Sequence, residues 1–83
     1  MYDILLAREA EKQLKSLDKR YQKAIAQSLI RLSANPKIGE PLAYELKGKF
    51  RIRVSRYRIV YEINHNKQEI MILIIEHRKD VYR

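Results

Sequence analysis

The sequence predicts a small α+β domain in which a helical hairpin packs on a small antiparallel sheet, in the order βααβββ. Apolar residues repeat at helical spacing through the first half of the chain and alternate with polar residues through the second half. Both prolines and both glycines lie between the two halves, in residues 35–49, which predicts a connecting loop. The 83 residues are enough for a single domain, 1–83, and because there is no cysteine, hydrophobic packing must stabilise it without disulfides.

The first half begins with a short strand, residues 2–6, and continues as two helices. Asp18 lies between the helices and suits the N-cap of the second one, which ends near Asn35 and Pro36. Because the turn is so short, the helices must fold back on each other as an antiparallel hairpin. The two apolar stripes consist of Ala7, Ala10, Leu14 and Leu17 and then of Tyr21, Ile25, Leu29 and Leu32.

The second half predicts three strands. Residues 50–55 and 57–63 alternate between apolar and polar side chains, as expected for half-buried strands. A polar turn follows, and then the run IMILII, residues 70–75, which does not alternate. This run predicts a strand that is covered on both faces at the centre of the sheet.

The run FRIRVSRYRIVYEI contains four arginines. If Ser55 and Arg56 form a two-residue loop, Arg53 lies opposite Arg58, and Arg51 shares their face of the sheet. Directly opposed like charges destabilise a sheet, and a bound anion would remove that cost. The alternative is a solvated strand face that prevents edge-to-edge aggregation. Because guanidinium groups match phosphate oxygens bidentately, we favour a phosphate-binding surface.

The segment EHRKDVYR follows the last strand and places His77, Arg78 and Tyr82 at the rim of the sheet. Rims of rigid sheets are common positions for functional sites. Each residue also has a structural explanation, because His77 can cap the strand, Arg78 can pair with Glu76 or Asp80, and Tyr82 can anchor the chain end by packing.

The composition favours a polyanionic partner or an acidic protein partner, because 18 lysines and arginines against 10 acidic residues give a net charge of +8. The amino end lacks the basic and apolar regions of a signal peptide, and the longest apolar run is far shorter than the about 20 residues of a membrane span. We therefore expect a cytoplasmic protein with no membrane contact. The two histidines have no ligand-like neighbours, so we expect no metal site and no cofactor.

The connector NPKIGEPLAYELKG, the run LKGKFRIRVSRYRIVYEI and the ending HRKDVYR occur in this order along the chain. Together they resemble the RelE/ParE superfamily of toxins from type II toxin–antitoxin systems, and specifically its RelE branch. The resemblance covers nearly the whole chain and implies a microbial-ribonuclease-like (RelE-like) fold. It also implies a metal-independent endoribonuclease that cleaves mRNA in the ribosomal A site by 2′-OH attack and so inhibits translation. The implied partners are the ribosome, mRNA and a neutralising RelB-like antitoxin, through which a larger complex would bind operator DNA.

The resemblance also implies a set of catalytic residues. The branch carries lysines where this chain has Arg51 and Arg53, and arginine is a poor proton acceptor. The general base therefore stays open between His77 and Lys49, and a shift of the alignment by one or two residues would put His77 in the place of Arg78. The implied catalytic residues are Arg51, Arg53, Arg58, Arg78 and Tyr82.

Their implied roles follow the chemistry of RNA cleavage. Arg53 and Arg58 would bind the phosphate and stabilise its extra charge, with support from Arg51. Arg78 would protonate or stabilise the leaving 5′ oxygen, and Tyr82 would stack on a base or assist proton transfer. Two other readings remain: a ParE-like inhibitor of DNA gyrase, and a catalytically inactive homologue that only binds the antitoxin or nucleic acid.

Overall fold

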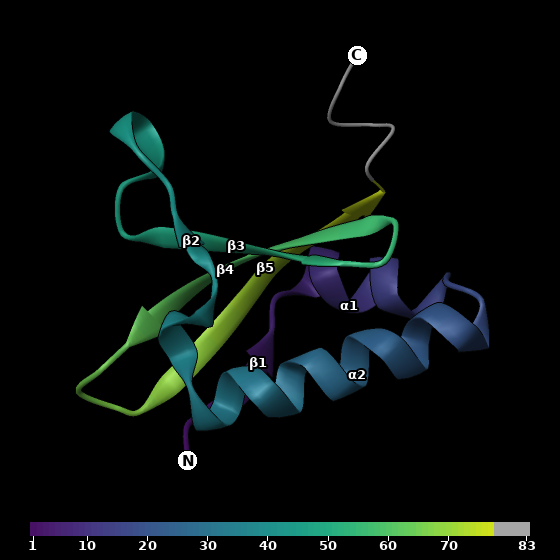
Figure 1. Cartoon of the computed structure of the whole chain (residues 1–83), viewed down its shortest axis with the longest axis horizontal. Helices are drawn as coiled ribbons and strands as arrows, with labels where there is room; N and C mark the ends of the chain where they lie inside the picture. Colours follow the sequence, from purple (N-terminus) through teal and green to yellow (C-terminus); the bar gives the residue numbers. More distant parts are fainter. Residues whose placement is uncertain (78–83) are drawn as a thin grey trace.

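The computed structural model describes residues 1–77, in which two helices pack on one face of a five-stranded sheet (Figure 1). The strand order is β1-β5-β4-β3-β2. The helices are α1 (Arg8–Lys15) and α2 (Lys19–Ala34), with short 3₁₀ turns η1 (Pro36–Ile38) and η2 (Tyr44–Leu46). The strands are β1 (Asp3–Leu6), β2 (Glu40–Pro41), β3 (Lys49–Val54), β4 (Tyr57–Asn64) and β5 (Glu69–His77).

The predicted α+β class and the helical hairpin are confirmed, and Asp18 caps α2 by accepting a hydrogen bond from the Arg20 backbone N–H at 3.1 Å. Two details of the sheet differ from the prediction. β1 runs parallel to β5, so the sheet is mixed. Short turns force antiparallel pairing, whereas β1 is separated from β5 by most of the chain and can pair in either direction.

The second difference is β2, which lies inside the predicted loop and pairs with the start of β3, so that Glu40 lies opposite Arg51. Two residues are too few to show a periodic pattern, which is why the sequence did not indicate this strand. The consequence is that an acidic side chain from the loop reaches the arginines of β3.

The core lies between the helices and the sheet. Ala10, Ile25 and Leu32 of the helices are fully buried, as are Ile59 and Tyr61 of β4. The prediction that residues 70–75 are covered on both faces is wrong: Ile70, Ile72 and Ile75 are buried, but Ile74 is 36% exposed. The helices cover only one face of the sheet, and no helix of residues 1–77 lies over the opposite face (Figure 1).

The hydroxyl of Tyr61 fixes the segment that leads into β2. It accepts a hydrogen bond from the Gly39 N–H at 3.0 Å and donates one to the Pro36 carbonyl at 2.8 Å. Gly39 has no room for a side chain, because a Cβ there would lie 2.5 Å from the Tyr61 hydroxyl and 2.6 Å from the Arg51 carbonyl oxygen. Burial raises the pKa of the Tyr61 phenol, and the hydrogen bond from Gly39 offsets part of that rise. This contact holds Glu40 beside Arg51.

Candidate functional site

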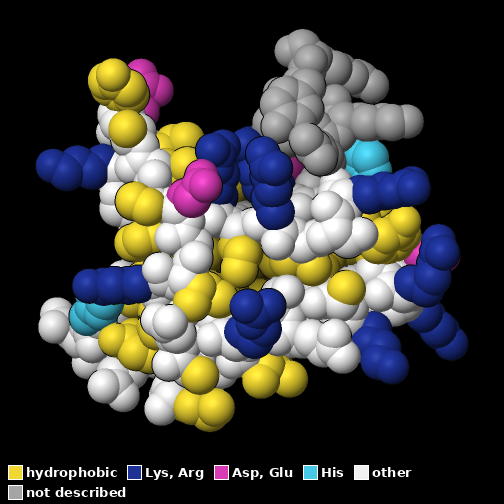
Figure 2. Space-filling model, viewed as in Figure 1, with side chains coloured by type: hydrophobic (Ala, Val, Ile, Leu, Met, Phe, Trp, Pro, Cys, Tyr) yellow, Lys and Arg dark blue, Asp and Glu magenta, His cyan; other side chains and the backbone are white. Residues whose placement is uncertain are grey.

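The sheet face opposite the helices carries the arginines of the β3–β4 hairpin. Val54 pairs with Tyr57 and Arg53 with Arg58, which confirms the two-residue loop and puts Arg51, Arg53 and Arg58 on one face. We call this surface, with Glu76 of β5, the arginine face. Figure 2 shows basic side chains gathered over the hairpin, with an acidic side chain beside them.

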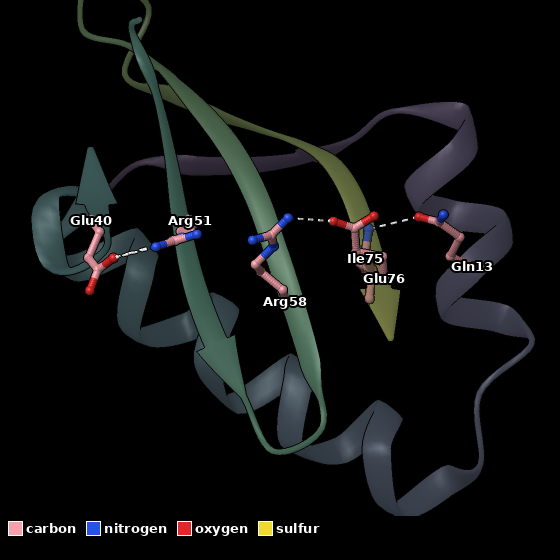
Figure 3. A network of polar contacts seen from close by, with 6 residues as sticks. All are labelled: Gln13, Glu40, Arg51, Arg58, Ile75 and Glu76. Atoms are coloured by element: carbon pink, nitrogen blue, oxygen red, sulfur yellow. Dashed lines mark hydrogen bonds and ion pairs between the residues drawn. The ribbon is translucent and has the colours of Figure 1, made fainter. Parts of the chain in front are cut away.

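Two of the three arginines are held by carboxylates (Figure 3). Arg51 donates from Nε and Nη2 to Glu40 Oε2 at 3.3 and 3.1 Å. Arg58 donates from Nη2 to Glu76 Oε1 at 3.0 Å, and its side chain is only 25% exposed. Arg53 is exposed and forms no ion pair with the residues that the structure describes. The face therefore has two arginines that are fixed by ion pairs, and a third, Arg53, that is available to bind an anion.

Glu76 also changes the explanation for Arg53 lying opposite Arg58. The repulsion between these two cations had indicated an external anion, but Arg58 also lies opposite Glu76 on its other side. The carboxylate offsets part of that repulsion within the chain itself. Glu76 was missed because β4 and β5 change register between Val60 and Tyr61, and the extra residue breaks the period-two rule between the strands.

The hydrogen bond to Glu76 uses one nitrogen of the Arg58 guanidinium, Nη2. The Arg58 Nε is buried and has no hydrogen-bond partner within residues 1–77. A buried donor without a partner costs about 1–3 kcal/mol.

A hollow of about 320 Å³ lies beside the arginine face, between η1, β2 and β3. A larger hollow of about 570 Å³ opens at the far end of the sheet, but its lining includes the carboxylates of Glu62 and Glu69, which disfavour a phosphate. The smaller hollow also contains a carboxylate, Glu40, but this one is paired with Arg51, and Arg53 lies in the same lining, so it is the better candidate for a nucleotide. It is lined by Ile38, Gly39, Glu40, Arg51, Ile52 and Arg53.

The two candidate general bases lie in different surroundings. The His77 ring contacts Tyr57 edge-on at 5.1 Å, and Tyr57 contacts Tyr21 of α2, so His77 is on the helix side of the sheet and not on the arginine face. Lys49 shares the parity of Arg51 and Arg53, and its Nζ lies 4.0 Å from a Glu62 oxygen. The geometry therefore disfavours His77 as the proton acceptor beside the arginines. Arg78 and Tyr82 lie outside the described residues.

The end of β5, which carries Glu76, is fixed by α1. The Ile75 N–H donates to Gln13 Oε1 at 2.7 Å (Figure 3). β1 ends at Leu6, opposite Ile72, so it has no residue that could pair with Ile75. Gln13 replaces that missing partner, and nothing in its sequence position had indicated this role.

Residues 1–77 show neither a metal-binding cluster nor a membrane-spanning helix. No group of three or more His, Asp or Glu side chains there is arranged to hold a metal ion. No helix in that range is both long and apolar enough to span a membrane.

Comparison with known proteins adds a family. A family model described as the ParE toxin of the type II toxin-antitoxin system parDE matches residues 4–82. Toxin RelG of Mycobacterium tuberculosis is 42% identical over 53 residues, which are 63% of this chain and 61% of RelG. The chain thus spans less than two thirds of that relative.

Solved structures show the same fold. A chain of the RelBE2 toxin–antitoxin complex from Mycobacterium tuberculosis is 32% identical, with a TM-score of 0.86 over 93% of this chain and 98% of that one. The isolated RelE toxin of E. coli matches with a TM-score of 0.82 at 17% identity, covering 93% of this chain and 84% of that one. At that identity the second match supports the fold alone.

Proposed function

This chain belongs to the RelE/ParE superfamily of toxins from type II toxin–antitoxin systems, and we propose that it is an endoribonuclease that cleaves mRNA on the ribosome. The observation that carries the proposal is the arginine face: three guanidinium groups on a rigid hairpin, one of them free of ion pairs to the described residues. Such a surface suits a phosphodiester, because guanidinium forks bind phosphate oxygens and stabilise added negative charge.

The chemistry requires no metal. The ribose 2′-OH attacks the adjacent phosphorus, which gives a 2′,3′-cyclic phosphate and a 5′-OH. Arg53 and Arg58 bind the phosphate and stabilise the transition state, and Arg51 supports them. Arg78 and Tyr82 keep their proposed roles at the leaving oxygen and at a base. With so few acids and bases, the site would be slow on free RNA, so we propose that the ribosome supplies part of the alignment.

The proposed inhibitor is a RelB-like antitoxin. The relative in the RelBE2 structure is part of a toxin–antitoxin complex, and this chain matches it at 32% identity. The net charge of +8 favours an acidic segment in such a partner.

The test is cleavage of a programmed mRNA by purified ribosomes, mapped by primer extension. We expect the wild type to cut within the A-site codon and Arg53→Ala to cut at least about 10-fold more slowly, because a charge-assisted contact to the phosphate is lost. Arg31→Ala is the matched control, since Arg31 is an exposed arginine on α2 and not on the arginine face. An intact mRNA with the wild type, or equal cutting by a folded Arg53→Ala protein, would contradict the proposal.

A second candidate function is inhibition of DNA gyrase, because the matching family model is described as ParE. A ParE-like protein would inhibit DNA gyrase instead of cutting RNA. An inhibited gyrase in a supercoiling assay, with mRNA left intact on ribosomes, would favour that function. Failure in both assays, with antitoxin or nucleic-acid binding retained, would indicate an inactive homologue.

A further inference from the structure

The three arginines of the arginine face supply no proton acceptor, and Lys49, the predicted base on their side of the sheet, pairs with Glu62 at 4.0 Å. Arginine stays protonated in proteins, so neither Arg51 nor Arg53 can remove a proton from a 2′-OH. The His77 ring lies on the helix side of the sheet, against Tyr57. A group on the arginine face itself would be better placed.

Glu76 is such a group. Its carboxylate lies 3.0 Å from Nη2 of Arg58, directly across from it on the neighbouring strand. Its side chain is 28% exposed, whereas those of the other carboxylates paired on this side of the sheet, Glu40 and Glu62, are 74% and 47% exposed. Glu76 is therefore the most enclosed of the three, and a partly enclosed carboxylate is less hydrated and keeps a fixed geometry.

The backbone that carries Glu76 is held from the helix side. The hydrogen bond from the Ile75 N–H to Gln13 fixes β5 immediately before Glu76. Arg58 fixes the side chain from the other direction. A general base must lie within hydrogen-bond reach of the proton that it removes, so such fixation favours the role.

We propose that Glu76 is the general base of the RNA cleavage; this inference rests on the proposed ribonuclease function. A phosphate bound at Arg58 brings the preceding 2′ oxygen near the Glu76 carboxylate. The carboxylate takes the 2′-OH proton as the O2′–P bond forms and the P–O5′ bond breaks. The leaving 5′ oxygen takes a proton from a donor of the site or from water, and Glu76 later returns its own proton to solvent.

The alternative is that Glu76 only positions Arg58. Glu76→Gln separates the two roles, because the amide oxygen can still accept the hydrogen bond from Arg58 but cannot take up a proton. A positioning role therefore predicts little change, whereas a general base predicts a loss of about 10²–10⁴-fold in rate.

The experiment measures single-turnover cleavage of ribosome-bound mRNA by the whole protein. We expect Glu76→Gln to lower the rate constant by about 10²-fold or more, with ribosome binding unchanged. Glu69→Gln is the matched control, because it makes the same change at the other end of the same strand, and it should cut at the wild-type rate. Circular dichroism verifies that each variant is folded.

A second variant tests the chemistry directly. Glu76→Ala leaves space for a small carboxylate, so sodium formate should restore part of its rate, while sodium chloride at equal ionic strength should not. A wild-type rate in Glu76→Gln, or a slow Glu76→Ala that formate does not accelerate, would overturn the inference and leave the ribonuclease proposal standing. A wild type that cuts no mRNA would overturn both.

Discussion

Tyr61 joins two parts of the molecule through one hydroxyl group. Its side chain is fully buried beneath the sheet, and its oxygen bonds both to the Gly39 N–H and to the Pro36 carbonyl. The segment that begins at Pro36 and Gly39 continues to Glu40, which forms an ion pair with Arg51. A core residue therefore determines how one arginine of the candidate site is held.

Replacing Tyr61 with Phe should lower the free energy of unfolding by about 1–3 kcal/mol, because the Gly39 N–H and the Pro36 carbonyl lose their partner. Urea denaturation at neutral pH measures the change. Tyr44→Phe is the control, since Tyr44 is 95% exposed, and the stability of this variant should match the wild type. A Tyr61→Phe protein as stable as the wild type would show that water replaces the hydroxyl without cost.

The pH dependence of stability follows from the raised pKa of Tyr61. Above pH of about 10, the unfolded chain loses the phenol proton while the folded chain still retains it, so the unfolded state binds fewer protons and stability falls as pH rises. The stabilising contribution is fully present below that pH. We expect the wild type to lose more stability than Tyr61→Phe between pH 9 and pH 11, measured by urea denaturation. Parallel losses in the two proteins would contradict the assignment.

At the scale of elements, the site depends on the end of β5. α1 supplies Gln13 to the backbone of Ile75, and the next residue, Glu76, pairs with Arg58 of β4. A helix on one face of the sheet thus supports a carboxylate on the other. This arrangement predicts that loss of the Gln13 hydrogen bond also changes the position of Glu76 on the arginine face.

Replacing Gln13 with Leu should leave the Ile75 N–H without an acceptor, which costs about 1–3 kcal/mol. Hydrogen exchange of the Ile75 amide should accelerate, and unfolding in urea should shift accordingly. Gln27→Leu, at an exposed position of α2, is the control. Gln13→Glu retains an oxygen acceptor and should stay closer to the wild type. Unchanged protection of Ile75 in Gln13→Leu would show that the contact is dispensable.

The elements also explain what sequence could and could not predict. The register of the β3–β4 hairpin was predictable, because a two-residue loop fixes which residues face each other, and so Arg53 and Arg58 were correctly placed together. The partner of Arg58 on β5 was not, because the extra residue near Leu73 breaks the alternation between the strands. The direction of β1 depends on long-range packing, which carries no local signal.

At the scale of the whole molecule, both helices cover one face of the sheet, and no helix of residues 1–77 lies over the arginine face (Figure 1). Glu40 and Glu76 neutralise Arg51 and Arg58 in part, which leaves Arg53 as the exposed cation of that face without an ion pair to the described residues. The net charge of +8 makes the chain as a whole attractive to a polyanion. A phosphate can therefore bind Arg53 without breaking an ion pair within the described residues.

This charge distribution predicts how binding to RNA responds to salt. Each phosphate contact releases condensed counterions, so the logarithm of affinity falls linearly with the logarithm of salt concentration, by about 0.7 per contact for single strands. We expect Arg53→Gln to reduce the slope for binding to mRNA-programmed ribosomes by about that amount. Arg31→Gln removes the same charge from the helix layer and should lower the net charge without changing the slope. Equal slopes for the wild type and Arg53→Gln would mean that Arg53 contacts no phosphate; equal reductions in both variants would mean that net charge alone, and not the arginine face, attracts the RNA.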